Sequence, residues 1–401
     1  MRNRWEPEDV IYNPFRSSMM RILAALFVWF GSTLAFAQAP LNGAAALGPL
    51  ASKSYLLVDV LSQQVLAAKN PDARVEPASL TKLMTAYVVF DALRQKRVTL
   101  SQPLMISEKA WRAPGSRMFL DPGKAVAIED LLRGMIVQSG NDASIALAEG
   151  IAGTEEAFVE QMNREAARLG LKNSNFVNAT GLPNPQHYST PADLVLLSAA
   201  IIREFPQYFP MYSLHEFRYN NITQRNRNDL LGRDPYVDGL KTGYTESAGF
   251  CMIATAQRNG RRLIAVVIDA GSESGRAAEA QRLLNYGFEA FDTVKLYARG
   301  QSVHQLPVWK GNSEQLQAGF TDDYYVTIPK GFGDRLKARL ESMQPLIAPI
   351  RSGDRVGTLR LTFDGQPFGE RTVVALQTVG IANLFVRGWH SLRLLARRFG
   401  D

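Results

Sequence analysis

Cysteine is nearly absent from this sequence. Cys251 is the single cysteine among 401 residues, so no disulfide can form within the chain. Either the protein resides in a reducing compartment, or a large core stabilises it without disulfides. Cys251 lies within an apolar, strand-like pattern, which indicates a core residue rather than a nucleophile.

Histidine is also scarce, and the patterns of several enzyme classes are missing. The histidines lie far apart and none belongs to an H-E-x-x-H pattern, which argues against zinc-dependent hydrolysis. The sequence has no G-x-S-x-G elbow and no Walker-type loop, which argues against an α/β-hydrolase and a P-loop enzyme. We therefore expect neither a metal nor a cofactor. The histidines are His187, His215, His304 and His390.

Acidic residues are outnumbered by basic ones. The net charge of +7 and the pI of about 9.4 are compatible with nucleic acid, an anionic membrane or an anionic polymer as partner. Zinc-finger spacing, a long Lys/Arg run and a basic heptad helix are all missing, so we expect no nucleic-acid partner. The hydrophobic fraction of 46% and charged fraction of 21% are ordinary for a globular chain, whose length suggests two or three domains.

The amino-terminal apolar run is short for a membrane span. Met20-Arg21 precedes the apolar residues 22–30, and the small-residue pattern Ala35-Phe36-Ala37 follows. A basic start, an apolar run and an A-x-A site predict a signal peptide that is cleaved after Ala37. An uncleaved anchor is the alternative, although a span needs roughly 20 apolar residues. Residues 1–18 are polar and partly acidic, which favours a translation start at Met19 or Met20.

Strand patterns lie at both ends of the central region, and helical patterns lie between them. The expected strands cover residues 54–60, 64–68, 237–242, 249–258 and 261–269, the last two joined by an Asn259-Gly260 turn. Apolar periodicity predicts helices over 79–93, 128–137, 154–169 and 277–291. Asn141 is expected to cap a helix that runs to about residue 149, and Thr190 to cap a helix that begins at Pro191. A sheet with helices on both faces satisfies this order.

The pattern changes at about residue 294. Strand-like pieces at 324–328, 356–362 and 366–374 alternate with turns and predict a small β-rich domain. Residues 381–399 then show an apolar, aromatic face and a basic remainder, which suits a membrane interface, although a helix packed on its own domain is the alternative. The expected divisions are residues 1–37 (upstream segment and signal peptide), 38–293 (catalytic domain), 294–378 (β-rich domain) and 379–401 (amphipathic helix).

Three short motifs follow one another in the central region. They are Ser79-Leu80-Thr81-Lys82 (S-x-x-K), Ser139-Gly140-Asn141 (S-x-N) and Lys241-Thr242-Gly243 (K-T-G). Taken alone, each has an ordinary explanation as a helix cap, a helix end or a strand entering a turn, and S-x-x-K occurs by chance about once or twice in such a chain. All three in this order, and in these predicted elements, indicate a serine acyl-transfer site.

The residue types explain how such a site would work. Ser79 is a poor nucleophile without an adjacent base, and Lys82 lies on the same helix face three residues later. A buried lysine close to another positive charge, which Lys241 could supply, loses pKa and can accept a proton. Ser139 is expected to relay a proton to the leaving amine, and Asn141 is expected to hold the substrate amide.

Substrate contacts are expected on the strand that carries K-T-G. Lys241 and Thr242 can meet a substrate carboxylate, and Gly243 allows a substrate backbone to approach closely. The backbone N–H groups of Ser79 and Tyr244 are the expected oxyanion donors.

Longer segments around these motifs resemble the low-molecular-mass penicillin-binding proteins, specifically the serine D-alanyl-D-alanine carboxypeptidases. The similarity extends from about Ser54 to the C-terminus. The segments are RVEPASLTKLMT (74–85), GSRMFLDPG (115–123), QSGNDA (138–143), QRNRNDL (224–230) and VDGLKTGYTESAGF (237–250).

The resemblance implies a transpeptidase- or β-lactamase-like α/β (α+β) catalytic domain, with an antiparallel sheet and helices on both faces. A small β-rich domain and a C-terminal amphipathic helix would follow it. The implied substrates are peptidoglycan stem peptides, from which the terminal D-Ala is removed through an acyl-enzyme, and β-lactams would be covalent inhibitors. The implied location is the periplasm, with peripheral attachment to the outer face of the inner membrane.

The resemblance also assigns roles to residues. Ser79 would be the nucleophile and Lys82 its proton acceptor, while Gly275-Arg276 resembles a pair whose arginine recognises the terminal carboxylate. Tyr244 departs from the family, in which close relatives often carry histidine. The loop at 173–190 contains no Asp or Glu to activate a deacylating water, so we expect a long-lived penicilloyl-enzyme. A β-lactamase, a DD-endopeptidase and a non-catalytic peptidoglycan-binding scaffold remain as alternatives.

Overall fold

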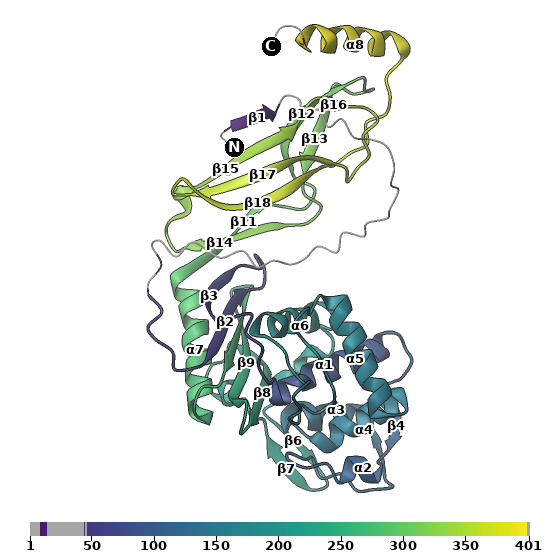
Figure 1. Cartoon of the computed structure of the whole chain (residues 1–401), viewed down its shortest axis with the longest axis vertical. Helices are drawn as coiled ribbons and strands as arrows, with labels where there is room; N and C mark the ends of the chain where they lie inside the picture. Colours follow the sequence, from purple (N-terminus) through teal and green to yellow (C-terminus); the bar gives the residue numbers. More distant parts are fainter. Residues whose placement is uncertain (1–8, 14–43, 45, 399–401) are drawn as a thin grey trace. The chain divides into compact units, whose positions relative to one another are not determined.

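The computed structural model describes residues 9–13, 44 and 46–398, so the predicted signal peptide at 20–37 lies outside the described residues. The chain divides into two compact units. Within the described residues, the larger unit covers residues 46–290, and the β-rich unit covers residues 291–398 together with 9–13 and 44. Figure 1 draws both units and colours each residue by its position in the sequence.

A five-stranded antiparallel sheet forms the centre of the larger unit. The strands, in order across the sheet, are β3 (Val65–Lys69), β2 (Ser54–Asp59), β10 (Arg261–Ile268), β9 (Gly249–Arg258) and β8 (Val237–Thr245). The predicted hairpin between β9 and β10 is confirmed, and its turn residues Asn259 and Gly260 have φ angles of 51° and 78°. β8, which carries the K-T-G motif, lies at the edge of the sheet.

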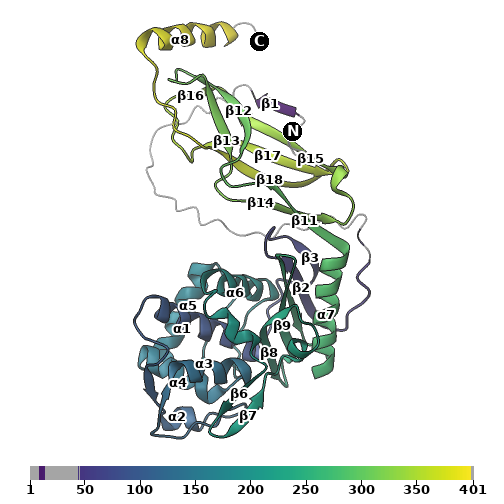
Figure 2. The same cartoon turned by 180° about the vertical axis from the view of Figure 1, so that it is seen from behind.

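Helices cover both faces of this sheet, as predicted. On one face α7 (Glu273–Ala290) contacts β9 and β10, and on the other α6 (Pro191–Glu204) contacts β2 and β10. Figures 1 and 2 show α7 and the larger group of helices on opposite sides of the strands. The remaining helices are α1 (Lys82–Arg94), α2 (Glu108–Trp111), α3 (Ile128–Val137), α4 (Asn141–Ala152) and α5 (Glu155–Leu169).

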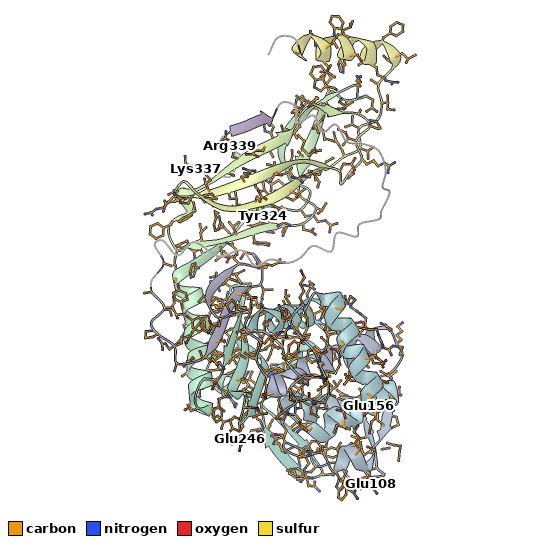
Figure 3. All side chains as sticks on the ribbon, in the orientation of Figure 1. Glu108, Glu156, Glu246, Tyr324, Lys337 and Arg339 are labelled. Carbon is orange, nitrogen blue, oxygen red and sulfur yellow. The ribbon has the colours of Figure 1, made fainter. Side chains whose placement is uncertain are left out.

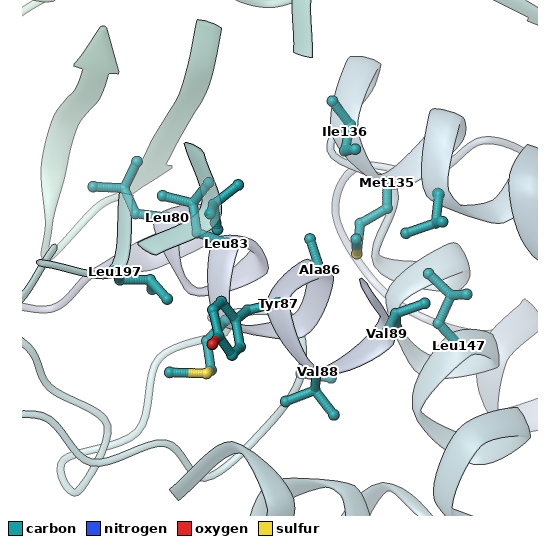
Figure 4. Close-up of a cluster of buried hydrophobic side chains, with 14 of the residues drawn as sticks. Leu80, Leu83, Ala86, Tyr87, Val88, Val89, Met135, Ile136, Leu147 and Leu197 are labelled. Atoms are coloured by element: carbon teal, nitrogen blue, oxygen red, sulfur yellow. The ribbon is translucent and has the colours of Figure 1, made fainter. Parts of the chain in front are cut away.

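α1 runs through the middle of the helical group, and nearly every side chain on it is buried. Figure 4 shows its apolar side chains packed among those of α3, α4 and α6. The labelled side chains are Leu80, just before α1, then Leu83, Ala86, Tyr87, Val88 and Val89 of α1, Met135 and Ile136 of α3, Leu147 of α4, and Leu197 of α6. Because α1 is buried on all sides, its first turn is held rigidly. That turn begins with Lys82, the last residue of the S-x-x-K motif, and Ser79 lies in the short turn just before it.

Threonine side chains cap the start of two of the helices. Thr190 accepts a hydrogen bond from the backbone N–H of Asp193, as the sequence predicted. Thr154, predicted as the first residue of its helix, instead caps α5 and accepts from the backbone N–H of Ala157. The predicted cap at Asn141 is wrong, because Gly140 occupies the cap position and Asn141 is the first residue of α4. The Asn141 side chain makes other hydrogen bonds, described below.

Several short elements were not predicted. The helix expected from Ser79 begins as a 3-10 turn, η1 (Ala78–Thr81), in which Ala78 has a φ of 46°. Three-residue and four-residue strands lack enough alternation to be recognised in sequence. These strands form two hairpins: β4 (Pro103–Met105) with β5 (Ala125–Ala127), and β6 (Glu216–Tyr219) with β7 (Ile222–Arg225).

The β-rich unit contains a seven-stranded sheet and a separate pair, β11 (Phe291–Tyr297) with β14 (Tyr324–Pro329). Leu336, Ala338 and Leu340 of β15 are buried and alternate with the exposed Lys337 and Arg339, which Figure 3 labels. The strands of the sheet, in order, are β1 (Asp9–Asn13), β15 (Leu336–Met343), β17 (Arg355–Phe363), β18 (Gln366–Ala375), β13 (Gln315–Gly319), β12 (Ser302–Trp309) and β16 (Leu346–Ile347).

The last helix, α8 (Leu384–Arg398), follows this sheet. His390 accepts a hydrogen bond at Nδ1 from the backbone N–H of Lys310 (2.8 Å), and its ring meets Trp309 edge-on. Five large apolar side chains of α8 are more than half exposed, at spacings of one, three and four residues: Leu384, Phe385, Trp389, Leu392 and Leu395. Among the helices that the structure describes, none combines the length and apolar character that crossing a membrane requires.

Candidate active site

The three motifs meet at one cavity of about 340 Å³ in the larger unit. The cavity is open on one side, and β8, η1, the start of α4 and a loop near residue 181 form its walls. Residues on its walls include Ser79, Ser139 and Asn141 of the first two motifs, Thr242, Gly243 and Tyr244 of β8, and the arginines Arg227 and Arg276.

Ser79 and Lys82 are in direct contact. The S-x-x-K spacing spans one turn, and it brings Lys82 Nζ to 3.0 Å from Ser79 Oγ. Lys82 Nζ also donates to Asn141 Oδ1 (2.7 Å) and to the backbone carbonyl of Thr180 (2.6 Å). With those two acceptors occupied, the remaining position on Nζ is directed at the serine hydroxyl.

The environment of Lys82 favours its neutral form. The side chain is buried, and burial together with the nearby positive charge of Arg227 lowers the pKa of Lys82 to about 7. Asp142 opposes this shift, but its carboxylate already accepts the backbone N–H groups of Met118 and Leu120. At neutral pH a large fraction of Lys82 is therefore an amine that can accept a proton.

Lys241 lies behind the cavity and not on its wall. Its side chain is buried, and its Nζ donates to the carbonyl of Thr242 (3.1 Å). Burial, followed by the charges of Lys82, Arg227 and Arg276, holds the pKa of Lys241 well below its usual range. The sequence suggested that Lys241 could supply a positive charge beside Lys82, and the charge of Lys82 does act on Lys241. Arg227 is a further cation that lowers the pKa of Lys82.

Ser139 and Asn141 face the cavity from the start of α4. Ser139 has a φ of 66°, and its buried Oγ has no hydrogen-bond partner among the described residues. Asn141 Nδ2 donates to the carbonyl of Pro114 (2.6 Å), so both ends of its amide are already engaged. Asn141 thus orients Lys82, and a substrate amide would have to share its oxygen.

β8 approaches the nucleophile closely at Gly243. A Cβ atom at this position would lie 3.2 Å from each of three atoms: the Ala78 Cβ, the Pro77 carbonyl oxygen and the Ser79 backbone nitrogen. Only glycine allows this approach without displacement of the strand or of η1. Tyr244 follows, with its side chain 51% exposed at the cavity wall.

Two arginines give the cavity its positive charge. Arg276 of α7 is buried, and it donates to the carbonyl of Gly243 (3.4 Å) and to Glu273 Oε1 (2.7 Å). Arg227 lies in the loop before β8 and was not predicted as a site residue, although it belongs to the family-like segment QRNRNDL. No carboxylate is found among the described residues that line this cavity, so it suits an anionic group.

The loop at 173–190 was expected only to lack a carboxylate, yet it helps to build the site. Gly181 fits against the Ala78 carbonyl, since a Cβ at 181 would lie 1.8 Å from that oxygen. The buried His187 holds the loop to η1, with Nε2 2.8 Å from Thr81 Oγ1 and Nδ1 accepting from the Val177 N–H (3.3 Å). This loop therefore fixes the Thr180 carbonyl beside Lys82.

The arrangement suits acyl transfer to a serine. It combines a hydroxyl in contact with a neutral amine and a cationic wall that can receive a carboxylate. Across the described stretches of the chain, no three or more His, Cys, Asp or Glu residues come together as metal ligands.

Comparison with known sequences gives matches over both units. A sequence model of the D-alanyl-D-alanine carboxypeptidase family (peptidase S11) matches residues 41–272, and one of the C-terminal domain of penicillin-binding protein 5 matches residues 291–380. D-alanyl-D-alanine carboxypeptidase DacA of Haemophilus influenzae is 39% identical over 354 residues, 87% of this chain and 90% of that protein. D-alanyl-D-alanine carboxypeptidase DacD of Escherichia coli K12 is 39% identical over 374 residues, 91% of this chain and 96% of that protein.

Solved structures agree. Penicillin-binding protein 5 from Haemophilus influenzae superposes with a TM-score of 0.81 at 39% identity, covering 84% of this chain and 99% of that chain. Penicillin-binding protein D2 from Listeria monocytogenes, in its ampicillin-bound form, gives a TM-score of 0.56 at 32% identity, covering 60% of this chain and 98% of that chain. The predicted fold class is confirmed. Matched over more than half its length, and similar to DacA across nine tenths of that relative, this chain belongs to the D-alanyl-D-alanine carboxypeptidase family of serine peptidases.

Proposed function

We propose that this chain removes the terminal D-Ala from peptidoglycan stem pentapeptides through an acyl-enzyme on Ser79. The observation that carries the proposal is the 3.0 Å contact between Ser79 Oγ and Lys82 Nζ, inside a cavity whose wall holds Arg227 and Arg276. The contact pairs a nucleophile with its base, and the positively charged arginines can bind the C-terminal carboxylate of a peptide.

Acylation begins with proton transfer from Ser79 to Lys82. The neutral amine of Lys82 takes the hydroxyl proton while Ser79 Oγ attacks the carbonyl carbon of the penultimate residue. The hydrogen bonds to Asn141 and Thr180 use the two hydrogens of that amine and direct its lone pair to Ser79. The proton then passes to the leaving nitrogen, with the unpartnered Ser139 hydroxyl as relay, and D-Ala departs.

The negative charge of the tetrahedral intermediate falls beside the backbone of β8. Its oxygen would accept from the N–H groups of Ser79 and Tyr244, and the glycine at 243 keeps these two segments close. Water later attacks the acyl-enzyme with Lys82 again as proton acceptor, which releases the shortened peptide and restores Ser79.

Recognition of the terminal carboxylate falls to Thr242, Arg227 and Arg276 on the cavity wall. Lys241, buried directly behind Thr242, adds positive potential when it is protonated and polarises the strand through its bond to the Thr242 carbonyl. Lys241 therefore contributes to carboxylate recognition only through its charge, whereas the cavity-wall residues contact the carboxylate directly.

β-Lactams present a carboxylate and a reactive carbonyl at similar positions, so we propose that they acylate Ser79. The similar penicillin-binding protein D2 has been solved in an ampicillin-bound form. A β-lactamase activity is disfavoured because neither the loop at 173–190 nor the described part of the cavity wall offers a carboxylate to activate water.

A DD-endopeptidase remains as a second candidate, because one relative carries that name. The D-alanyl-D-alanine endopeptidase of Pseudomonas aeruginosa is 36% identical over 242 residues, which is 58% of this chain. The carboxypeptidase relatives match much more of the chain, the β-rich unit included. A non-catalytic scaffold is disfavoured by the intact contact of Ser79 with Lys82.

We also propose that the protein works in the periplasm, attached to the outer face of the inner membrane. Two features support this location: the signal-peptide pattern at residues 20–37 and the exposed apolar side of α8. Arg387 and Arg393 on the same helix would favour an anionic lipid surface.

The decisive assay measures free D-Ala after incubation with an N-acyl-L-Lys-D-Ala-D-Ala peptide and with a stem pentapeptide. The wild-type chain should release D-Ala from both, and Ser79→Ala should release none. Cross-linked muropeptides serve as the parallel substrate. Cleavage of the cross-link without release of D-Ala would replace the carboxypeptidase by the endopeptidase, and cleavage of neither would refute both.

A further inference from the structure

Tyr244 is the one aromatic side chain on the described cavity wall, and it is more than half exposed. Residues 239–243, which precede it on β8, are all buried. A phenol also stands where the family resemblance leads one to expect an imidazole. A bulky ring at the open side of a substrate cavity invites the question of which part of the substrate it meets.

The ring is held in place from the neighbouring strand. Tyr244 lies opposite Phe250 in the β8–β9 register, and the two rings are tilted by 31° with centroids 4.4 Å apart. Phe250 in turn lies 5.8 Å from the guanidinium of Arg276. Because Phe250 already restricts the Tyr244 ring, the ring loses little conformational entropy when a substrate binds. Contact between the ring and a substrate therefore carries only a small entropic cost.

Strand geometry indicates the end of the cavity that the ring faces. Side chains two residues apart point to the same face of a strand, so Tyr244 shares its face with Thr242. Thr242 belongs to the wall proposed to receive the terminal carboxylate, together with Arg276. The ring of Tyr244 would therefore flank the residue that leaves, because the position next to it, Gly243, lies so close to Ser79 that an added Cβ would be 3.2 Å from the Ser79 backbone nitrogen.

We propose that the Tyr244 ring contacts the side chain of the leaving C-terminal residue and makes the enzyme prefer D-alanine over glycine there. The inference rests on the proposed carboxypeptidase function and adds a determinant of specificity to it. Transfer of one methyl group from water to an aromatic surface favours the larger residue by about 4-fold to 10-fold.

The test compares two peptides that differ only in the leaving residue: N-acyl-L-Lys-D-Ala-D-Ala and N-acyl-L-Lys-D-Ala-Gly. Both form the same acyl-enzyme, so any difference in kcat/KM arises before deacylation. The variants are Tyr244→Ala, Tyr244→Phe and Tyr244→His. The matched control is Tyr236→Ala, which removes a ring that is 52% exposed, stacks on Arg258 and does not line the cavity.

The ratio of the two kcat/KM values should fall about 4-fold to 10-fold in Tyr244→Ala, fall partly in Tyr244→His, and stay unchanged in Tyr244→Phe and Tyr236→Ala. An unchanged ratio in Tyr244→Ala would overturn the inference. An equal loss in Tyr244→Phe would also overturn it, because the hydroxyl and not the ring would then be responsible. If Tyr244→Ala fails to fold, an unchanged ratio in Tyr244→His would overturn the inference in its place. A wild-type chain that releases neither residue would refute the proposed function itself.

Discussion

At the residue scale, the proposed chemistry of Ser79 requires Lys82 to be neutral at working pH. Burial and Arg227 lower the pKa of Lys82 to about 7, and only the unprotonated amine can accept the Ser79 proton. The rate of acylation by benzylpenicillin should therefore rise with pH through about 7 and then level off. Stopped-flow measurement of that rate across the neutral range, from mildly acidic to mildly alkaline pH, provides the profile.

Replacement of Arg227 tests whether the inflection of this pH profile reports the pKa of Lys82. Its charge disfavours protonation of Lys82, so Arg227→Gln should raise the pKa of Lys82 and move the inflection to higher pH. Arg233→Gln, which replaces an exposed arginine that does not line the cavity, is the control and should leave the inflection in place. A wild-type rate that does not change across this range would contradict the role given to Lys82.

The contact of Ser79 with Lys82 could be predicted from the sequence, whereas the parts played by Arg227 and Thr180 could not. Ser79 and Lys82 are three residues apart on one helix, so their contact follows from helix geometry. The charge of Arg227 and the Thr180 carbonyl both act on the Lys82 amine from loops, where no periodicity relates position in sequence to position in space. A backbone carbonyl in addition has no sequence signature at all.

At the element scale, the loop at 173–190 is fastened to η1 through a neutral histidine. Burial and then Lys82 lower the pKa of His187 to about 4, below the roughly 6.5 of an unfolded chain. The unfolded state therefore takes up the proton first, and the native state loses stability as pH falls from about 6.5 towards about 4. His187 should account for about 2 to 3 kcal/mol of the stability lost between about pH 7 and about pH 4.5.

Urea denaturation of wild type and His187→Gln at both pH values measures this contribution. The variant should lose about 2 to 3 kcal/mol less than wild type on acidification. His215→Gln, which changes an exposed histidine, should lose as much as wild type. Equal losses in wild type and His187→Gln would show that the histidine does not hold the loop through its neutral form.

The closeness of β8 to η1 gives a second prediction at this scale. In Gly243→Ala the added methyl carbon would lie 3.2 Å from Ser79 N and from two further atoms. This is too close for an ordinary contact, so β8 must move away from the nucleophile. Acylation by benzylpenicillin should slow about 10-fold to 100-fold, because small displacements of oxyanion donors are costly. Gly232→Ala, where no atom lies within 4 Å of the new methyl, should react at the wild-type rate. A wild-type acylation rate in Gly243→Ala would show that the backbone of β8 beside Ser79 does not stabilise the oxyanion.

Elements were predicted well where one face is buried and poorly where tertiary contacts decide. The β9–β10 hairpin, α3 and α5 follow from alternation, helical periodicity and caps. Asn141 was misassigned as a cap because asparagine favours that position in general, whereas here its amide bonds to Lys82 and Pro114. The 3-10 turn at η1 depends on Ala78, whose positive φ no local preference predicts.

At the scale of the whole molecule, α8 presents large apolar side chains that the described residues leave more than half exposed. Phe385 is 91% exposed and Trp389 is 57% exposed, while His390 fastens the helix to Lys310. Phe385→Glu and Trp389→Glu should each weaken binding to vesicles that contain anionic lipid by about 10-fold or more, with D-Ala release unchanged.

Co-sedimentation with such vesicles measures this binding, and Met105→Glu is the matched control. Met105 is 65% exposed in the larger unit, so its replacement should not alter the bound fraction. Equal binding by all three variants and wild type would show that α8 does not mediate attachment to the membrane.

The whole molecule is most directly tested by mass spectrometry of the intact chain after exposure to benzylpenicillin, followed by peptide mapping. We expect a single adduct of the mass of the antibiotic, located on Ser79 and still present after minutes, because the loop at 173–190 lacks a carboxylate to activate water. Ser79→Ala should gain no mass. An unmodified wild-type chain, an adduct on another residue, or rapid loss of the adduct with turnover of the antibiotic would contradict this expectation.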